Sequence, residues 1–156
     1  MNEVTGKKMS DSAIGKTHLI LVNAVVFKGN QVLVSQRSWD EPHEPGKWTI
    51  PGGKVERTTG DVFGILEETL KKEVQEETGV KIESELQLIT NNTFIRSTGQ
   101  HVVAMVFKCR YKSGKAFPLE DTIDCKWATL NQIKKMEFAP SVKKYILEAF
   151  KKIKRT

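Results

Sequence analysis

The 156-residue sequence lacks the features that mark secreted, membrane-spanning or fibrous proteins. It contains two cysteines, Cys109 and Cys125, which are too few for a disulfide framework and show no metal-ligand spacing. We therefore expect reduced, partly buried thiols. No apolar run approaches the roughly 18 residues of a membrane span, and residues 1–16 have no apolar signal-peptide core. Repeats and low-complexity segments are also absent. These absences predict a cytoplasmic protein with no membrane partner.

Length and charge set further limits. A chain of 156 residues is about the size of one domain. We expect a single domain over residues 18–156, preceded by a disordered tail over residues 1–17, where polar residues show no periodicity. The net charge of +6 favours anionic ligands, but it does not choose among nucleotides, nucleic acids and membrane surfaces.

The most informative stretch covers residues 51–80, where a glycine-marked loop leads into a helix-forming segment that ends in clustered glutamates. Glu73, Glu76 and Glu77 are spaced i, i+3 and i+4, so a helix brings their carboxylates to one edge within about one turn. Like charges in this arrangement repel each other, and they lie at the negative end of the helix dipole. A bound cation would remove both penalties.

The ligand types indicate which cation this would be. Oxygen donors that leave coordination positions free suit Mg²⁺ or Mn²⁺, which bind through carboxylates, water and substrate phosphates. The alternative is a solvated acidic helix face, which is the usual meaning of clustered acids. Gly52 and Gly53 favour a site, because glycine lets the backbone approach a ligand closely. The stretch therefore predicts a metal site for a phosphate ester or anhydride.

Two segments, PGGKVE at residues 51–56 and KEVQEETGV at residues 72–80, resemble the Nudix box. The family pattern is Gly, five residues, Glu, seven residues, then Arg-Glu-aliphatic-any-Glu-Glu-any-Gly-aliphatic. Its second half matches at Glu73, Val74, Glu76, Glu77, Gly79 and Val80. The resemblance implies an α/β fold, a Nudix-type α/β/α sandwich with a mixed β-sheet. It also implies a pyrophosphohydrolase that uses a divalent metal to cleave the phosphoanhydride of nucleoside diphosphate-linked compounds.

The box departs from the family pattern in its loop. Lys72 stands where the family has arginine, and it lies five residues further from the glycines than the pattern allows. This spacing predicts an insertion around residues 57–64, with Gly64 at the position of the first box glutamate. Glu68, four residues before Lys72, is placed to form a helical ion pair with it. Asp61 is either a replacement acid or the N-cap of the helix, and we expect the N-cap.

The resemblance also implies roles for individual residues. The implied metal ligands are all oxygen donors, namely the Gly52 carbonyl and the carboxylates of Glu73, Glu76 and Glu77. The implied catalytic acids are Glu76, Glu77 and Asp121, of which Glu76 and Asp121 are both open as the proton acceptor. The implied phosphate-binding cations are Arg37 and Lys54. For Arg37 and Asp121, an ordinary solvent-facing charge is the alternative.

The hydrophobic pattern places this stretch among strands and helices. Strands are expected over residues 18–27, 31–38, 81–96 and 101–111, and a further short strand ends near Ala128. The first two strands are joined by a hairpin turn at Gly29-Asn30, and the next two form a second hairpin. Trp48 is expected to pack in the core.

Two helical stripes are expected to face the sheet. The stripe of the box helix consists of Val62, Leu66, Leu70 and Val74, with Phe63 beside it. Helices are also expected over residues 130–136 and 140–156. The last helix has an apolar stripe of Val142, Ile146, Phe150 and Ile153 opposite its lysines.

Substrate identity is left open among several phosphoanhydrides. Nucleoside triphosphates, cleaved to monophosphate and pyrophosphate, are the first expectation, with ADP-ribose and dinucleoside polyphosphates as alternatives. A non-catalytic nucleotide-binding Nudix module is a rival of another class. An RNA 5′-end pyrophosphohydrolase would suit the basic C-terminal helix, although no aromatic residues are interleaved with its lysines as nucleic-acid binding favours.

Overall fold

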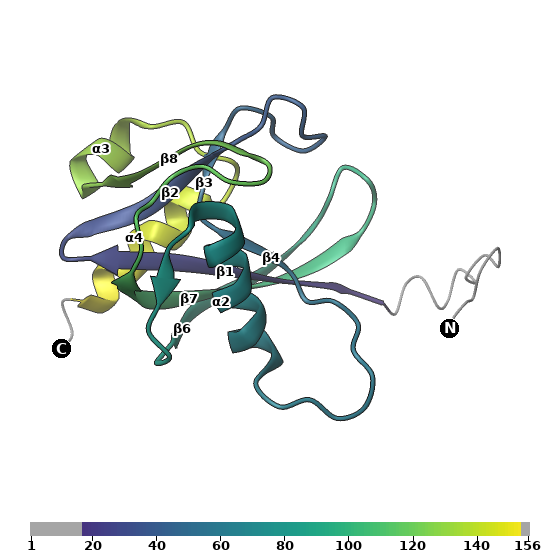
Figure 1. The fold of residues 1–156 in the computed structure, drawn as a ribbon. Coiled ribbons are helices and arrows are strands. Elements are labelled where there is room, and N and C mark those ends of the chain that lie inside the picture. The colour runs from purple at the N-terminus through teal and green to yellow at the C-terminus, as the bar shows by residue number, and fades with distance from the viewer. Residues whose placement is uncertain (1–16, 154–156) are drawn as a thin grey trace.

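A computed structural model describes residues 17–153, in which a mixed β-sheet separates two helical layers (Figure 1). The strands are β1 (Leu19–Lys28), β2 (Gln31–Arg37), β3 (Trp48–Thr49), β4 (Gly52–Lys54), β5 (Lys81–Ile82), β6 (Gln87–Ile95), β7 (His101–Ser113) and β8 (Thr122–Ala128). The helices are α2 (Ile65–Thr78), α3 (Leu130–Lys135) and α4 (Val142–Ile153). The expected N-terminal tail lies, except for Thr17, outside the described residues. No helix within residues 17–153 is both long and apolar enough to pass through a membrane.

Strand β1 organises the sheet, because three strands pair with it. It runs parallel to β7 from Leu19, opposite Val102, to Phe27, opposite Arg110. Its other edge pairs antiparallel with β4 at residues 21–23 and with β2 at residues 27–28. Residues 48–54 therefore pass from β2, which pairs with β3, to β1, which pairs with β4.

The predicted hairpins are confirmed, but one predicted strand is divided. Lys28 pairs with Gln31 across the Gly29-Asn30 turn, and β6 pairs antiparallel with β7. The single strand expected over residues 81–96 is wrong, since β5 and β6 are separate and both pair with β7. The polar and exposed residues 83–85 lie between them. These side chains offer nothing to bury, which explains why the strand breaks there.

Apolar side chains of α4 cover one face of the sheet. Val142 and Ile146 are buried and Phe150 is partly buried, as the predicted stripe requires, whereas the Ile153 side chain is outside the described part of the chain. Trp48 also packs against this cluster, which confirms its predicted core role. Both cysteines are free and buried as well, and burial raises the pKa of each thiol to about 12. They are therefore uncharged at neutral pH and are poor nucleophiles.

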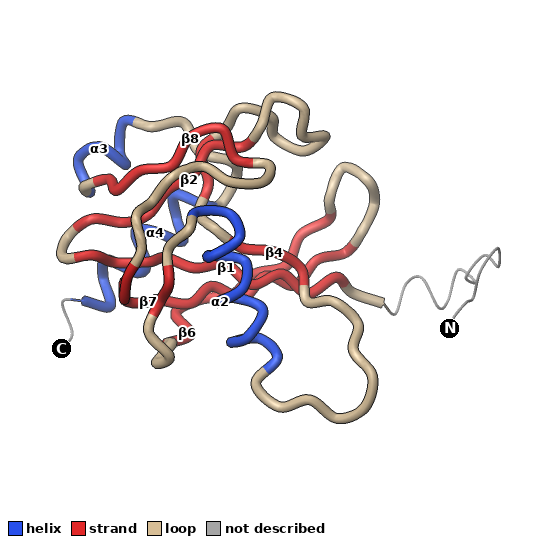
Figure 2. The backbone as a smooth tube through the Cα atoms, viewed as in Figure 1, coloured by secondary structure: helices blue, strands red, loops and turns tan. Residues whose placement is uncertain are grey.

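Helix α2 covers the other face, but it is shorter than the predicted stripe. Leu70 and Val74 are fully buried, whereas Val62 is 42% exposed and Phe63 is 87% exposed. The expectation that the last two pack on the sheet is wrong, because the helix begins only at Ile65. The inserted residues form a loop that projects beyond the sheet (Figure 2).

The ends of α2 are both set by glycine. The N-cap is Gly64 with φ 72°, and no side chain caps the helix, so the N-cap role predicted for Asp61 is wrong. At the other end, Gly79 is left-handed with φ 75°, and its N–H donates to the carbonyl of Gln75 at 2.9 Å. Glycine takes this conformation without the strain that a Cβ would add, so the helix stops directly after its glutamates.

The unequal burial of α2 and its preceding loop leads to a stability prediction. Leu70→Ala is expected to lower the free energy of unfolding by about 3 kcal/mol, because it leaves a cavity in a fully buried site. Phe63→Ala is the matched control and should change it by less than about 0.5 kcal/mol. Urea denaturation of both variants measures the difference. Similar losses in both would contradict this description of the packing.

Candidate active site

A polar pocket of about 560 Å³ lies beside β1, where its pairing passes from β4 to β2. Strands β1, β2 and β4, helix α2 and the loops before β3, after β6 and before β8 all contribute to its lining. Six of the residues singled out from the sequence line it together, namely Arg37, Gly52, Lys54, Glu73, Glu77 and Asp121. Glu76 is not part of this lining. The fold thus gathers side chains from four separate parts of the chain.

The two glycines of β4 allow close contact with β1 at Gly52 and with α2 at Gly53. A Cβ on Gly52 would lie 2.3 Å from the Val22 carbonyl oxygen and 2.7 Å from Asn23 Oδ1. A Cβ on Gly53 would lie 2.6 Å from Glu73 Oε1. Side chains at these positions would displace backbone in the first case and a carboxylate in the second. The glycines are required here by contact with their neighbours.

Glu77 is the most perturbed acid of the pocket. Its Oε1 accepts a hydrogen bond from the Gly52 N–H at 3.3 Å. Burial raises the pKa of Glu77 to about 8, and the nearby charges of Glu73 and Glu120 add to the rise, while the Gly52 N–H opposes it. Removing a carboxylate from water disfavours its charged form, and like charges disfavour it further. In the absence of a cation, this carboxyl group therefore holds a proton at neutral pH.

Glu73 lies beside Glu77 and shares its environment. Burial raises the pKa of Glu73, as do the charges of Glu76 and Glu120, whereas Lys72 lowers it. Within residues 17–153, no lysine, arginine or histidine makes an ion pair with either acid. Once both groups ionise, no ion pair among the described residues therefore neutralises their negative charge.

Glu76 occupies the outer side of the same helical turn. Residues of an α-helix are rotated by about 100° each, so Glu76 and Glu77 lie on opposite sides of Glu73. Glu77 is on the side of the buried Val74, whereas the Glu76 side chain is 39% exposed. Its Oε2 lies 3.9 Å from Lys72 Nζ, so Lys72 pairs with Glu76 and not with Glu68 as predicted.

Arg37 is held against the pocket wall by the loop that follows β2. Its Nη2 donates to Glu41 Oε1 at 2.9 Å, and its Nε donates to the His43 carbonyl at 2.8 Å. His43 Nδ1 lies 3.0 Å from Ser97 Oγ, which joins this loop to the β6–β7 turn. Arg96 of that turn also lines the pocket. Sequence reasoning gave His43 and Arg96 no role, because only the tertiary contact brings them to the site.

The loop before β8 supplies two acids to the pocket. Asp121, favoured from the sequence, lines the pocket, and its carbonyl accepts the Ser38 N–H at 3.0 Å. Glu120 also lines the pocket, and its charge contributes to the raised pKa of both Glu73 and Glu77. Glu120 is therefore the loop acid whose charge acts on both helix carboxylates. The sequence signal for it was only its position next to Asp121.

The acids fit a hard divalent cation, although they are not assembled into a complete metal centre. Among residues 17–153, no three acidic, histidine or cysteine side chains are arranged closely enough to hold a metal ion. Glu73 and Glu77 nevertheless provide two oxygen-donor groups with raised pKa values, and neither makes an ion pair within residues 17–153. Mg²⁺ is usually bound through one or two carboxylates, with water and substrate phosphates completing its shell. The pair meets that requirement.

The sheet, its two helical layers and this acid-lined pocket define an α/β protein suited to a phosphorylated ligand. The model of the NUDIX domain matches residues 17–150, and the chain belongs to this family of pyrophosphohydrolases. It is similar to a MutT-like protein from Streptomyces ambofaciens, with 28% identity over 117 residues. That match covers 74% of this chain and 67% of the relative.

Solved structures of the family share the fold. A MutT protein from Methanosarcina mazei Go1 is similar with a TM-score of 0.70 and 26% identity, covering 89% of this chain and 97% of that one. The NUDIX domain of Shewanella oneidensis NrtR, complexed with ADP ribose, is similar with a TM-score of 0.74 and 22% identity. That match covers 93% of this chain and 94% of the other. The predicted Nudix-type α/β fold with a mixed sheet is therefore confirmed.

Proposed function

We propose that the protein hydrolyses the phosphoanhydride bond of a nucleoside diphosphate linked to another group, with Mg²⁺ or Mn²⁺ bound at Glu73 and Glu77. The supporting observation is this pair of partly buried carboxylates, which has no cationic partner within residues 17–153 and lies against the glycines of β4. The pKa of Glu77, raised to about 8, indicates that a cation would be better accommodated there than bare negative charge.

The oxygen donors would bind the metal, and a nearby lysine would bind the phosphates. Glu73, Glu77 and the Gly52 carbonyl would hold the metal, with Glu76 as a further ligand. The bound metal would neutralise phosphate charge and lower the pKa of a coordinated water. Lys54, which directly follows the two glycines, would hold phosphate oxygens through the charge of its ammonium group.

Arg37 would position the phosphates from the opposite wall. Its hydrogen bonds to Glu41 and His43 use two of its five N–H donors and fix the direction of the guanidinium group. The remaining donors are available to a ligand in the pocket. Because the side chain is already held, little conformational entropy is lost when an anion binds.

A carboxylate must accept the proton of the attacking water. Among the acids considered, Glu76 lies outside the pocket lining, whereas Glu120 and Asp121 are part of it. We therefore propose that the proton acceptor is one of these two loop acids. A general base must reach the water within hydrogen-bond distance, which the pocket-lining position favours.

Two substrate classes are the main candidates. Nucleoside triphosphates are the first, as expected from the sequence. ADP-ribose is the second, because the NUDIX domain of NrtR, which shares this fold, was solved in complex with ADP ribose. Both contain the diphosphate that Glu73, Glu77, Lys54 and Arg37 would bind.

A substrate panel tests the proposed function. Nucleoside triphosphates, ADP-ribose, dinucleoside polyphosphates and 5′-triphosphorylated RNA are incubated with the protein and Mg²⁺ or Mn²⁺, and the phosphate-containing products are quantified. We expect turnover of free nucleotides that is abolished by EDTA. Binding without turnover, measured by calorimetry, would indicate a non-catalytic module. Preferred cleavage of the RNA would instead indicate an RNA 5′-end pyrophosphohydrolase.

A further inference from the structure

A pocket of about 510 Å³ lies between the end of α3 and the start of α4, and it shares no lining residue with the active-site pocket. All of its lining residues fall within residues 134–144. We call it the lysine pocket, because four of its ten lining residues are Lys134, Lys135, Lys143 and Lys144. It is a concave surface, separate from the active site, with an excess of positive charge.

The lysines of this pocket are not neutralised by nearby acids. The one acid of the lining, Glu137, is paired at 2.7 Å with Lys47, which is not part of the lining. Within residues 17–153, none of the four lysines makes an ion pair. Lys143 Nζ donates to the Lys134 carbonyl at 3.2 Å and lies 5.9 Å from the centre of the Phe138 ring. Like charges gathered in this way repel one another, and an anionic partner would remove the penalty.

Two of the lysines stand where a helix disfavours a cation. Lys143 and Lys144 lie in the first turn of α4, which contains no acid. The N-terminus of a helix carries partial positive charge, so acids stabilise it and lysines do not. The helix dipole does favour Lys134 and Lys135, in the last turn of α3. Lys144 has no such explanation, and in the described part of the chain its ammonium group makes no hydrogen bond or ion pair.

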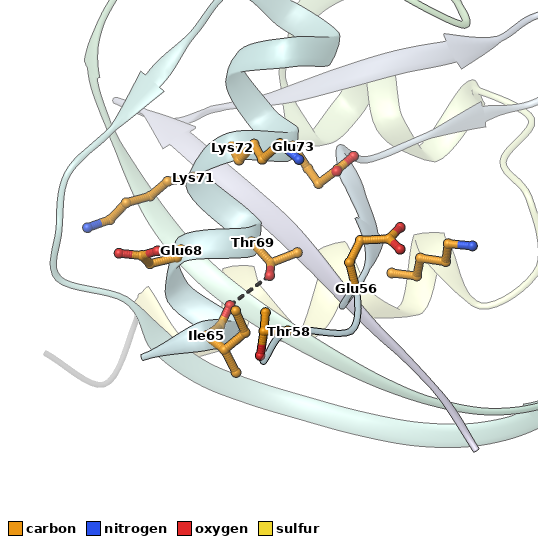
Figure 3. Close-up of a pocket in the computed structure, with 9 residues that line it drawn as sticks. Glu56, Thr58, Ile65, Glu68, Thr69, Lys71, Lys72 and Glu73 are labelled. Carbon is orange, nitrogen blue, oxygen red and sulfur yellow. Dashed lines mark hydrogen bonds between the residues drawn. The ribbon is translucent and has the colours of Figure 1, made fainter. Parts of the chain in front are cut away.

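A pocket beside the active site has balanced charge by comparison (Figure 3). It measures about 460 Å³, lies between α2 and the loop over residues 55–64, and is lined by three lysines and three glutamates. Such a lining offers no preference for a partner of either sign. The lysine pocket, with four lysines and one paired glutamate, does select for an anion.

Apolar side chains form the rest of the lysine pocket. They belong to Met136, Phe138, Ala139 and Pro140. All but Pro140 are partly buried against the core. This stretch is fixed to β3, because the Trp48 N–H donates to the Glu137 carbonyl at 3.0 Å and the Ala139 N–H donates to the Trp48 carbonyl at 2.9 Å. The pocket is therefore formed before a partner binds, which lowers the entropic cost of binding.

This combination of charge and apolar surface favours a peptide over other anions. A free phosphate would leave most of the pocket, and all of its apolar surface, unfilled. A nucleic acid strand would also use open aromatic faces on which its bases stack. Phe138, the one aromatic residue of the lining, is partly buried and has Lys143 over its ring. A bilayer surface cannot enter a concave pocket.

We propose that the lysine pocket is a docking site for an acidic peptide segment of a partner protein, in which carboxylates flank an aliphatic or aromatic side chain. The carboxylates would pair with Lys134, Lys135 and Lys144. The apolar side chain would pack on Met136 and Pro140. Because the two pockets share no lining residue, the docked peptide leaves the active site open.

Fluorescence anisotropy with labelled polymers tests this docking site on the 156-residue protein. The probes are poly-glutamate, a glutamate–tyrosine copolymer, polyphosphate and oligouridine, matched in negative charge and measured in EDTA so that no divalent metal takes part. We expect the Kd of the copolymer to be about 10-fold or more below that of poly-glutamate, because an apolar side chain is buried in addition to the ion pairs. The copolymer should also bind more tightly than polyphosphate and oligouridine.

Two pairs of charge reversals locate the binding. Lys134→Glu combined with Lys144→Glu alters two exposed lysines of the pocket and should weaken copolymer binding by about 10-fold or more. Lys112→Glu combined with Lys115→Glu changes the net charge equally at exposed positions outside the lining, and should alter the affinity by less than about 2-fold. Met136→Gln should lower the advantage of the copolymer over poly-glutamate by about 5-fold and leave poly-glutamate binding unchanged. Circular dichroism checks that each variant is folded.

Three results would overturn the docking proposal. They are equal affinity for the copolymer and poly-glutamate, tighter binding of polyphosphate or oligouridine than of the copolymer, and an equal loss of affinity in the two pairs of charge reversals. None of them bears on the proposed hydrolysis, because the measurements exclude divalent metal and the altered residues lie outside the active-site pocket.

Discussion

Replacing Glu77 by glutamine is expected to lower kcat by about 100-fold or more while the fold is retained. The amide has nearly the same shape, but it carries no negative charge with which to bind a cation. Steady-state rates at saturating Mg²⁺ measure the loss, and the fold is checked by circular dichroism. Glu67→Gln, another acid-to-amide change on α2, serves as control and should keep its activity, because Glu67 lies outside the pocket.

The same substitution is expected to change how stability depends on pH. The folded-state pKa of Glu77 is about 8, above the ordinary value of 4.5. Between pH 4.5 and pH 8, Glu77 therefore holds a proton in the folded protein that it loses in the unfolded protein. Stability is therefore fully retained below about pH 4.5 and falls as the pH rises towards 8. Glu77→Gln removes this loss, and near pH 8 without metal it should be more stable than the parent by roughly 2 kcal/mol.

With a divalent metal bound, the parent protein should instead be more stable than Glu77→Gln near pH 8. Mg²⁺ bound to the ionised pair would stabilise the parent protein and would do little for the variant. Thermal unfolding of both proteins at pH 5 and pH 8, with and without Mg²⁺, measures how pH and the metal change the stability of each. Near-normal turnover in Glu77→Gln, or a parent protein whose stability rises between pH 5 and 8 without metal, would contradict the assigned position of Glu77.

Gly53→Ala is expected to reduce activity by at least about 10-fold without unfolding the protein. The added Cβ would lie 2.6 Å from Glu73 Oε1, so the carboxylate must move away from β4. The end of a glutamate side chain can rotate at little cost, so the structure accommodates the change. Glu73 would then leave the position beside Glu77, and the Mg²⁺ concentration needed for half-maximal activity should rise.

Gly52→Ala is expected to have a different effect from Gly53→Ala, because Gly52 lies against backbone and Gly53 against a side chain. There the added Cβ would lie 2.3 Å from the Val22 carbonyl oxygen, which is part of β1 and cannot move without distorting the sheet. This variant should lose stability by roughly 2 kcal/mol or more, whereas Gly53→Ala should stay near the parent value. Urea unfolding of both variants tests the contrast. If Gly53→Ala retained full activity at limiting Mg²⁺, Glu73 would not be a metal ligand.

The sequence predicted the local features of the site because they depend on neighbours along the chain. The i, i+4 spacing of Glu73 and Glu77 places both acids on one side of a helix, and Gly79 ends that helix. Strand-forming segments separated by short turn segments likewise predicted the two hairpins. The start of the box helix was predicted wrongly, because more than one residue before it could serve as the N-cap. Asp61 resembled an N-cap, but the helix begins after Gly64.

Two other errors came from extending a pattern too far along the chain. Phe63 continues the apolar stripe in sequence, yet it is exposed because the insertion is loop and not helix. The strand expected over residues 81–96 divides because three consecutive polar residues have no face to bury.

The sequence by itself determined the kind of chemistry, since a turn of helix with three glutamates behind a pair of glycines can be read in order along the chain. Only the tertiary structure decided how those acids differ. Packing of α2 against β4 withdraws Glu77 from water and leaves Glu76 outside the pocket, and it brings Glu120 to the same place. Burial and distant charge set a carboxylate's pKa, and both depend on contacts between segments far apart in the sequence.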